Sequence, residues 1–213
     1  MAAPTGPRID KVVTSGTFSL DGQDFDVDNN VWIVGDDAEC VVIDAAHDHE
    51  PIVEGVAGRA VVAVVCTHGH NDHVNAAPAL ADAVGAPVWL HPSDTMLWEQ
   101  VHPRRPVDAS LHDGQVIAVA GRKLKVIHTP GHSPGGCSLH DHAGRVLFSG
   151  DTLFKGGPGA TGRSFSSFAT IIDSIRDRLL PLEDETVVHT GHGDETTIGE
   201  EAPDLDRWIA RGH

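Results

Sequence analysis

The sequence has no tyrosine, only three cysteines and few basic residues, and no stretch approaches the roughly 20 apolar residues needed to cross a bilayer. We therefore expect no membrane-spanning segment. Lysine and arginine together number 15, against 31 aspartates and glutamates, which gives a formal net charge of −16. Phosphate backbones and anionic membrane surfaces repel so acidic a chain, so nucleic acid is not an expected partner. The charge instead predicts a solvated acidic surface.

The cysteines, Cys40, Cys66 and Cys137, are odd in number, and none forms a C-x-x-C pair. This pattern is typical of reduced thiols in a reducing compartment. Cys66 ends an apolar run, so we expect a small buried hydrophobic residue there. Residues 1–11 have no apolar core of the kind that a signal peptide carries, so a cytoplasmic location is expected.

The 213 residues are 40% apolar and 22% charged, the composition of a globular protein, and we expect one domain over residues 1–213. Short β-like runs occur at residues 31–34, 40–43, 61–65, 88–90, 116–119, 124–127, 146–148 and 186–188, and helix-like segments at 51–55, 76–84, 166–180 and 203–210. In segment 166–180 the apolar residues form one helical face, as in a helix that packs onto a sheet. The mixture is neither all-β nor strictly alternating and predicts an α/β fold with a large β-core.

Histidine is unusually abundant, with 15 residues, and three of them fall in one short motif. The segment T-H-G-H-N-D-H (residues 67–73) follows the run at 61–65 and contains His68, His70, Asp72 and His73. Imidazoles packed this densely repel one another when protonated and lose solvation when buried, unless a cation compensates. The motif therefore indicates a metal site, since imidazole is the commonest side-chain metal ligand.

Three further ligand-type residues follow later β-like runs. His132 lies in H-T-P-G-H-S-P-G (128–135), Asp151 in F-S-G-D-T-L-F (148–154) and His192 in V-H-T-G-H-G (188–193). Proline and glycine fix tight turns there and present these side chains from strand ends. Four strand ends thus carry ligand-type residues, as expected if one sheet edge lines a single site.

In this order, the motifs T-H-x-H-x-D-H, G-H, G-D and G-H resemble those of the metallo-β-lactamase superfamily. The fuller forms H-T-P-G-H-S-P-G and F-S-G-D-T-L-F resemble its glyoxalase II branch, the hydroxyacyl-thiol hydrolases. The match covers residues 30–201. The resemblance implies an αββα sandwich, two central mixed β-sheets flanked by helices, with the site along one sheet edge.

The resemblance also implies the metal ligands and the chemistry. One ion would be bound by His68, His70 and His132, the other by Asp72, His73 and His192, and Asp151 would bridge both. Nitrogen and oxygen ligands without thiolate suit Zn²⁺ and also admit iron or manganese, so we expect two divalent ions, with zinc the favoured metal. A hydroxide bridging the metals would attack the substrate carbonyl, with Asp72 and Asp151 as the catalytic residues that keep it oriented.

The expected substrate is a small-molecule thiol conjugate, a thioester, because a thiolate leaves easily and no dedicated acid is evident. Glutathione-specific members of the family carry a C-terminal helical extension that holds the thiol, whereas 21 residues (193–213) follow His192 here. The Gly-rich segment after Asp151 has Lys155 and Arg163 at its ends, and we expect these cations to bind an anionic or sugar-like carrier. Eleven arginines against four lysines hint at a GC-rich bacterial genome, where a carrier such as mycothiol replaces glutathione. The sequence predicts no oligomeric state.

Two alternatives remain open. A persulfide dioxygenase of the same fold would use a single iron at His68, His70 and His132, and a metal-binding protein without turnover would need the ligands alone. The complete second ligand set favours hydrolysis. β-Lactam hydrolysis is disfavoured because residues 1–11 show no export signal, and lactone hydrolases of this fold that use a tyrosine are disfavoured because the chain has none.

Other polar residues near the motifs have supporting roles or none. Asp44 follows the run at 40–43 and either orients a ligand imidazole or is an ordinary turn residue. His128 and His189 each precede a ligand turn, and we expect them to hydrogen-bond near the site rather than bind metal. Surface or loop positions are expected for His47, His49, His91, His102, His112, His140, His142 and His213.

Overall fold

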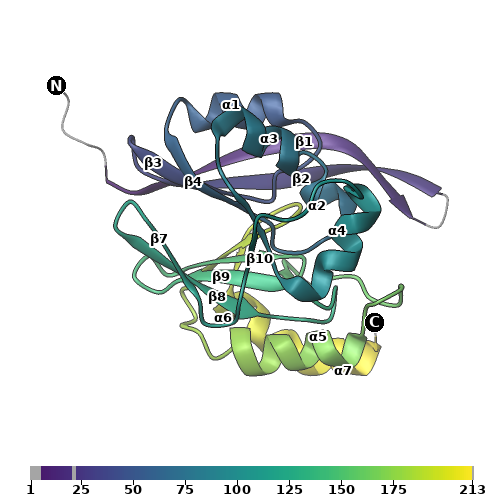
Figure 1. Cartoon of the computed structure of the whole chain (residues 1–213). Coiled ribbons are helices and arrows are strands. Elements are labelled where there is room, and N and C mark those ends of the chain that lie inside the picture. The colour runs from purple at the N-terminus through teal and green to yellow at the C-terminus, as the bar shows by residue number, and fades with distance from the viewer. Residues whose placement is uncertain (1–5, 21–22, 213) are drawn as a thin grey trace.

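The protein is described by a computed structural model over residues 6–20 and 23–212, in which two six-stranded sheets form the central layers (Figure 1). The strands of the first sheet, in their order across it, are β1 (Arg8–Leu20), β2 (Gln23–Gly35), β3 (Glu39–Ile43), β4 (Ala60–Val65), β5 (Val88–Leu90) and β6 (Ala109–Ser110). The pairs β1–β2 and β2–β3 are antiparallel, whereas β3 to β6 run parallel.

The second sheet is mostly antiparallel. Its strands, in order, are β14 (Thr196–Thr197), β13 (Val187–Thr190), β10 (Val146–Gly150), β9 (Cys137–Asp141), β8 (Arg122–His128) and β7 (Val116–Val119). Only β10 and β13 pair in parallel among the described residues of this sheet. A small ribbon of β11 (Leu153–Phe154) and β12 (Gly157–Pro158) follows β10.

Helices cover the outer faces of both sheets (Figure 1). The segments beside the first sheet are α1 (His49–Val56), α2 (Asn71–Val74), α3 (Ala77–Val84), η1 (Pro92–Asp94) and α4 (Thr95–Val101). Those beside the second are α5 (Phe168–Ser174), η2 (Ile175–Leu179), α6 (Ile198–Glu201), η3 (Ala202–Asp204) and α7 (Leu205–Arg211). The arrangement is an αββα sandwich, and the predicted fold class is confirmed.

Side-chain alternation along the strands builds the three apolar layers. On β2, Trp32 and Val34 point between the sheets, while Val31 and Ile33 point toward α1 and α3. On β10, Phe148 points between the sheets and Leu147 packs with α5. Successive side chains of a strand face opposite ways, so a strand buried on both faces needs an unbroken apolar run. This is why these strands are visible in the sequence as continuous apolar segments.

All eight predicted β-runs coincide with strands, although the run at 186–188 begins one residue before β13. The prediction of eight strands is nevertheless wrong, because it omits β1 and β9 among others. β1 contains many polar residues and a glycine, and it forms a strand because it pairs with β2 along its whole length. β9 contains His140 and lies between β8 and β10. His140 is therefore buried, with 6% of its surface exposed, and the expectation of a surface position was wrong.

The predicted helix at 166–180 is present as α5 followed by a π-helical turn, η2. Its apolar face, including Ile171, Ile175 and Leu179, is buried against the second sheet as expected. The sequence did not predict α2, a short helix that contains the end of the histidine motif, or α4, a short helix that contacts α2. Within the described ranges, no helix is long and apolar enough to cross a membrane.

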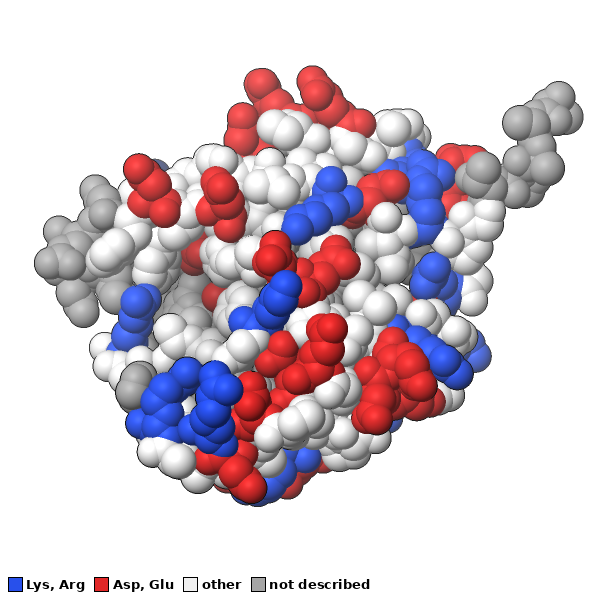
Figure 2. Space-filling view, turned by 180° about the vertical axis from the view of Figure 1, so that it is seen from behind, with Lys and Arg blue, Asp and Glu red and all other residues white. Residues whose placement is uncertain are grey.

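Acidic side chains are spread over the face in Figure 2, with lysine and arginine side chains among them. Exposed ion pairs such as Arg176 with Asp173 and Asp177 contribute little stability, because solvent screens them. On this face the negative charge is therefore distributed and solvated.

Candidate metal centre

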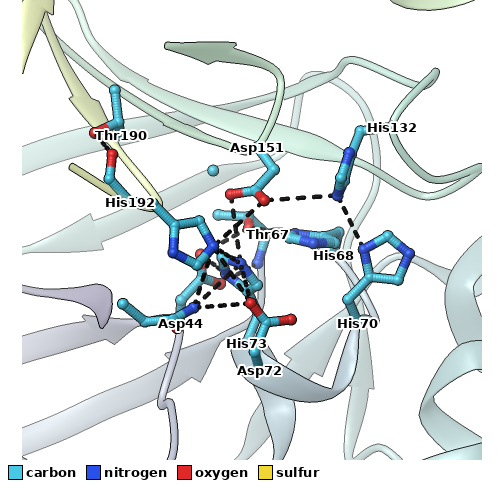
Figure 3. Close-up of polar contacts among 12 residues, drawn as sticks. Asp44, Thr67, His68, His70, Asp72, His73, His132, Asp151, Thr190 and His192 are labelled. Carbon is cyan, nitrogen blue, oxygen red and sulfur yellow. Dashed lines mark hydrogen bonds and ion pairs between the residues drawn. The ribbon is translucent and has the colours of Figure 1, made fainter. Parts of the chain in front are cut away.

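The four predicted ligand segments meet at one edge of the sandwich. His68 and His70 follow β4, and α2 then carries Asp72 and His73. His132 lies in the loop between β8 and β9, Asp151 directly follows β10, and His192 lies two residues after the end of β13. The two sheets present these ends on the same side, so residues as far apart in the sequence as Asp72 and His192 come into contact (Figure 3).

Interatomic distances within the cluster are those of ligands around shared ions. His73 Nε2 lies 3.2 Å from His192 Nε2 and 3.5 Å from Asp72 Oδ2, and His192 Nε2 lies 3.3 Å from that same oxygen. Nitrogen ligands at about 2.0–2.1 Å from a tetrahedral zinc are about 3.3 Å apart, so this trio matches one coordination shell. Asp151 reaches both sides, with Oδ2 3.6 Å from His132 Nε2 and 3.5 Å from His192 Nε2.

In three of the imidazole rings, the nitrogen that faces away from the cluster donates a hydrogen bond. His132 Nδ1 donates to the Ala160 carbonyl at 2.8 Å, and His192 Nδ1 donates to the Asp28 carbonyl at 2.7 Å. His73 Nδ1 donates to Asp44 Oδ2 at 3.0 Å. A carbonyl or carboxylate can only accept, so each Nδ1 carries a proton, and Nε2 is the nitrogen that would bind a metal ion after losing its own proton.

Asp44 also orients a fourth imidazole, that of His68. Thr67 Oγ1 donates to Asp44 Oδ2 at 2.7 Å and is 3.1 Å from His68 Nδ1, from which it accepts. The Thr67 backbone N–H donates to Asp44 Oδ1 at 2.7 Å. Of the two roles left open for Asp44, the structure shows the orienting one, and the same carboxylate serves His73 and His68.

Asp94, which the sequence analysis did not identify, ties two ligand segments together. Its Oδ2 accepts from the Gly69 N–H at 2.8 Å and from Ser133 Oγ at 2.7 Å, and its Oδ1 accepts from the Gly135 N–H at 2.5 Å. Gly69 lies between His68 and His70, and the two other donors flank the His132 turn. Asp94 follows β5 at the same sheet edge, and that position was the available signal.

Asn29 is a second residue that sequence reasoning missed. Its Nδ2 lies 3.3 Å from Asp72 Oδ2 and 3.4 Å from His192 Nε2, and its Oδ1 lies 2.7 Å from His47 Nε2. His47 is thus half-buried behind the centre rather than free at the surface. An asparagine within a long β-strand gives no sequence signal for such a role.

Glycine is required before two ligand residues because neighbouring groups approach the backbone closely. A Cβ on Gly191 would collide with Asp151 Oδ1, and a Cβ on Gly150, whose φ is +50°, would collide with the Thr67 side chain. The G-H and G-D motifs are therefore packing requirements of the site itself.

The carboxylates strongly attract positive charge. Burial opposes protonation of His192, but hydrogen bonds to Asp151 and Asp72 outweigh burial and raise its pKa to about 10. Burial likewise opposes protonation of His73, yet the same two carboxylates and Asp44 raise its pKa well above the usual range. Burial alone would raise the pKa of Asp72, but His73 and His192 lower it to about 2.

The other side of the cluster offers neutral nitrogens. Burial, reinforced by neighbouring imidazoles, holds the pKa of His68 well below its usual range, and burial together with His132 lowers the pKa of His70 to about 3. His68 Nε2 is buried and has no hydrogen-bond partner among the described residues. An unsatisfied neutral nitrogen beside carboxylates that demand positive charge fits a bound cation.

Three sets of potential ligand atoms meet in this cluster, and within each set the atoms lie no more than 4.8 Å from one another. They are His68, His70 and His132; His68, His73 and Asp151; and Asp72, His73 and His192. The donor set of imidazole and carboxylate without thiolate suits zinc and also iron or manganese. The residues therefore fit two metal ions.

The two predicted carrier-binding cations differ in position. Arg163 lines the cavity above the cluster, together with Phe18, Val27 and Phe154, and this cavity measures about 410 Å³. Lys155 is exposed and lies 3.5 Å from Asp194, and it does not line the cavity among the described residues.

The two histidines that precede ligand turns do not enter the cluster. His128 Nε2 donates to the Pro134 carbonyl at 2.9 Å, and its ring stacks on that of His91 with centroids 4.2 Å apart. His189 packs against Trp32 with ring centroids 4.3 Å apart. His128 thus forms the expected hydrogen bond, whereas His189 Nδ1 has no hydrogen-bond partner among the described residues and lies 3.3 Å from Glu195 Oε1.

The chain belongs to the metallo-β-lactamase superfamily, whose family model matches residues 25–192. Among curated relatives, hydroxyacylglutathione hydrolase GloC of Haemophilus influenzae is 33% identical over 186 residues, covering 80% of this chain and 87% of that protein. The expected superfamily is thereby confirmed.

Two solved structures are similar to this protein in both fold and sequence. The BLEG-1 B3 metallo-β-lactamase matches with a TM-score of 0.76 and 30% identity, covering 89% of this chain and 97% of its own. TTHA1623, solved in a di-iron-bound form, matches with a TM-score of 0.73 and 34% identity, covering 83% of this chain and 93% of its own. Proteins similar to this one thus include a hydroxyacylglutathione hydrolase, a β-lactamase and a protein that holds two irons.

Proposed function

We propose that this protein is a metal-dependent hydrolase that cleaves the thioester of a low-molecular-weight thiol. The observation that carries the proposal is the cluster of seven converging ligand-type side chains, in which His68 Nε2 is buried without a partner among the described residues. The similarity to GloC supports a thiol conjugate as the substrate.

The ligands in this proposal are His68, His70 and His132 for one ion and Asp72, His73 and His192 for the other, with Asp151 shared. Two divalent ions there, with zinc the favoured metal, would act as Lewis acids and make a water molecule nucleophilic near neutral pH. Asp72 and Asp151 would supply the carboxylate ligands. The hydrogen bonds that the Nδ1 atoms of His73, His132 and His192 donate hold these rings so that each Nε2 points at the centre.

Side-chain nucleophiles do not offer a competing route. Burial raises the pKa of all three thiols, those of Cys40, Cys66 and Cys137, which keeps them protonated. Ser133 Oγ donates to Asp94, and Ser149 Oγ donates to the Leu153 carbonyl at 2.8 Å. Water is therefore the nucleophile that this site is built to use.

The cavity above the cluster fits a small acyl group. Phe18, Val27 and Phe154 provide apolar walls, and His70, Asp72 and Asp151 form part of the lining next to the centre. An acyl chain packed on the apolar walls would hold its carbonyl against the polar floor.

The test is hydrolysis of S-acyl glutathione and S-acyl mycothiol by protein loaded with zinc, assayed with and without oxygen. We expect equal rates in both atmospheres, because hydrolysis consumes no oxygen. A strict requirement for iron and oxygen, with sulfite formed from a thiol persulfide, would replace the hydrolase with the dioxygenase alternative. No release of thiol from any thioester would refute the proposal.

The similarity to a B3 metallo-β-lactamase favours β-lactam hydrolysis as a second candidate. The same zinc-loaded protein should therefore be assayed with a chromogenic cephalosporin. A kcat/KM for the β-lactam that exceeds the kcat/KM for every thioester would establish this second candidate in place of the first.

A further inference from the structure

A second cavity adjoins the one above the metal cluster. It measures about 600 Å³, within the roughly 300–1,000 Å³ range of small-molecule sites. Its lining residues include Phe18, His70, Leu97, Gln100, Arg163 and Phe165. The two cavities share Phe18, His70 and Arg163, so they meet at these three residues.

The second cavity has two walls from distant parts of the chain. Helix α4 supplies Leu97, Gln100 and Val101 on one side, and the loop that follows β12 supplies Ser164 and Phe165 on the other. Leu97 and Val101 also pack into the protein, Leu97 being buried, so the α4 wall is fixed. A ligand in this cavity would lie against a preformed surface.

Arg163 sits at the junction of the two cavities. Its guanidinium carbon lies 5.4 Å from the centroid of the Phe18 ring, a cation–π arrangement that joins β1 to the loop carrying Arg163. This arrangement places one positive charge where a ligand would pass from one cavity to the other.

The charge of the second cavity contrasts with that of the whole protein. The chain has 31 aspartates and glutamates, yet none is among the described residues that line this cavity. The neighbouring cavity, in contrast, is lined by Asp28, Asp72 and Asp151. Polar groups in the second cavity include two amides, of Asn71 and Gln100, the Ser164 hydroxyl and the Arg163 guanidinium. These groups suit a ligand that bears amides or hydroxyls, and the guanidinium can also accept a carboxylate.

We propose that this second cavity binds the thiol carrier of the substrate, an amide- or hydroxyl-bearing thiol, while the acyl group occupies the cavity above the metal centre. The inference rests on the proposed thioester hydrolysis. A thioester bound with its carbonyl at the cluster must direct its sulfur to one side, and the shared residues His70 and Arg163 mark where the second cavity opens from the centre. A carrier of peptide or sugar type, being larger than the acyl group, takes the larger cavity.

The experiment fills the second cavity and compares substrates with and without a carrier. Gln100 is exposed on α4, so Gln100→Trp places bulk in the cavity without disturbing the core. Glu99→Trp is the matched control, because Glu99 is exposed on the same helix and lines a separate cavity. KM is measured with zinc-loaded protein for S-acetyl glutathione, S-acetyl mycothiol and the truncated thioester S-acetyl N-acetylcysteamine.

For Gln100→Trp we expect KM for the preferred full conjugate to rise at least about tenfold more than KM for the truncated thioester, since only the full conjugate reaches the second cavity. Glu99→Trp should change neither KM by more than about twofold. Gln100→Glu distinguishes the two carriers, because an added carboxylate repels the carboxylates of glutathione and leaves an uncharged sugar thiol almost unaffected.

Binding of the S-methyl conjugates, measured by calorimetry, adds a readout that needs no turnover. Loss of binding in Gln100→Trp but not in Glu99→Trp would support the inference. Equal KM shifts for full and truncated thioesters, or S-methyl conjugates that bind Gln100→Trp as tightly as the unmodified protein, would overturn it. If the unmodified protein cleaves no thioester, the proposed function fails instead, and the calorimetry still decides whether the cavity binds a carrier.

Discussion

Replacing Asp94 by asparagine tests whether a residue outside the ligand set holds two ligand segments in place. The Asp94 carboxylate accepts from the N–H groups of Gly69 and Gly135 and from Ser133 Oγ. An asparagine has one oxygen and one NH₂ group, so in either orientation at least one backbone N–H faces another donor. The segment around His70 and the turn around His132 then lose a shared anchor.

The magnitude follows from two opposing effects. Hydrogen bonds to a charged group contribute about 1.5–3 kcal/mol each, and a buried donor left without a partner costs about 1–3 kcal/mol. Burial, however, outweighs these hydrogen bonds and raises the pKa of Asp94, so the bonds offset only part of the cost of burying its charge. Asparagine removes that cost along with the bonds. We therefore expect a net loss of about 1–3 kcal/mol, which lowers the Tm of a chain this size by about 2–12 °C.

The more specific effect is on metal binding. Loss of a residue that orients ligands typically weakens metal affinity by about 10–100-fold, and we expect a loss in this range for zinc in Asp94→Asn. Zinc affinity is measured by competition with a chromophoric chelator, and Tm on the metal-free protein. The control is Asp82→Asn, since Asp82 is exposed and pairs only with Arg105 at 3.0 Å among the contacts described. Unchanged zinc affinity in a folded Asp94→Asn protein would refute the reasoning.

Two further predictions concern the cluster itself. Asp151→Ala should lower kcat by at least about 10³-fold and reduce the zinc content below two ions per chain, because Asp151 contacts both sides of the cluster. A kcat within tenfold of the unmodified value, with metal content retained, would show that Asp151 only supports the fold. The stability of the metal-free protein should depend on His192, whose folded pKa of about 10 lies above the ordinary value of 6.5. The contribution of His192 to the free energy of unfolding is complete below about pH 6.5 and is lost as the pH rises toward 10. Urea unfolding of protein freed of metal by a chelator should therefore show a free energy of unfolding that falls across this pH range. The fall should be smaller in His192→Ala. A chelated protein that gains stability from pH 6.5 to 10 would contradict the prediction.

Local patterns in the amino-acid sequence by themselves indicated an α/β fold and the members of the cluster, whereas the αββα arrangement was implied by the resemblance of the motifs to those of the superfamily. Strands buried on both faces require unbroken apolar runs, and a ligand directly after such a run is placed by the end of the strand. The positions of His68, His132, Asp151 and His192 after such runs are therefore enough to place each of them at a strand end, although these strands belong to two sheets whose ends meet at one edge of the sandwich. The glycines of G-H and G-D are also local signals, because at Gly191 and Gly150 the backbone has no space for a side chain.

Only the tertiary structure determined which groups orient those ligands and which cavities lie beside them. Asp94 and Asn29 act through contacts with segments 18 to 163 positions away. The position of Asp94 after β5 was a sequence signal, but neither the residue type nor the spacing of Asn29 distinguishes it from an ordinary polar residue. His140 has the sequence surroundings of a surface residue but lies on β9 between β8 and β10, since hydrogen bonding between distant strands, not side-chain pattern, decides which polar strands lie inside a sheet. Arg163 and Lys155 flank the same Gly-rich segment, but only the path of the loop brings Arg163 over Phe18 and leaves Lys155 beside Asp194. Local chemistry thus specified the ligands, while long-range packing specified their orientation and the cavities that open from them.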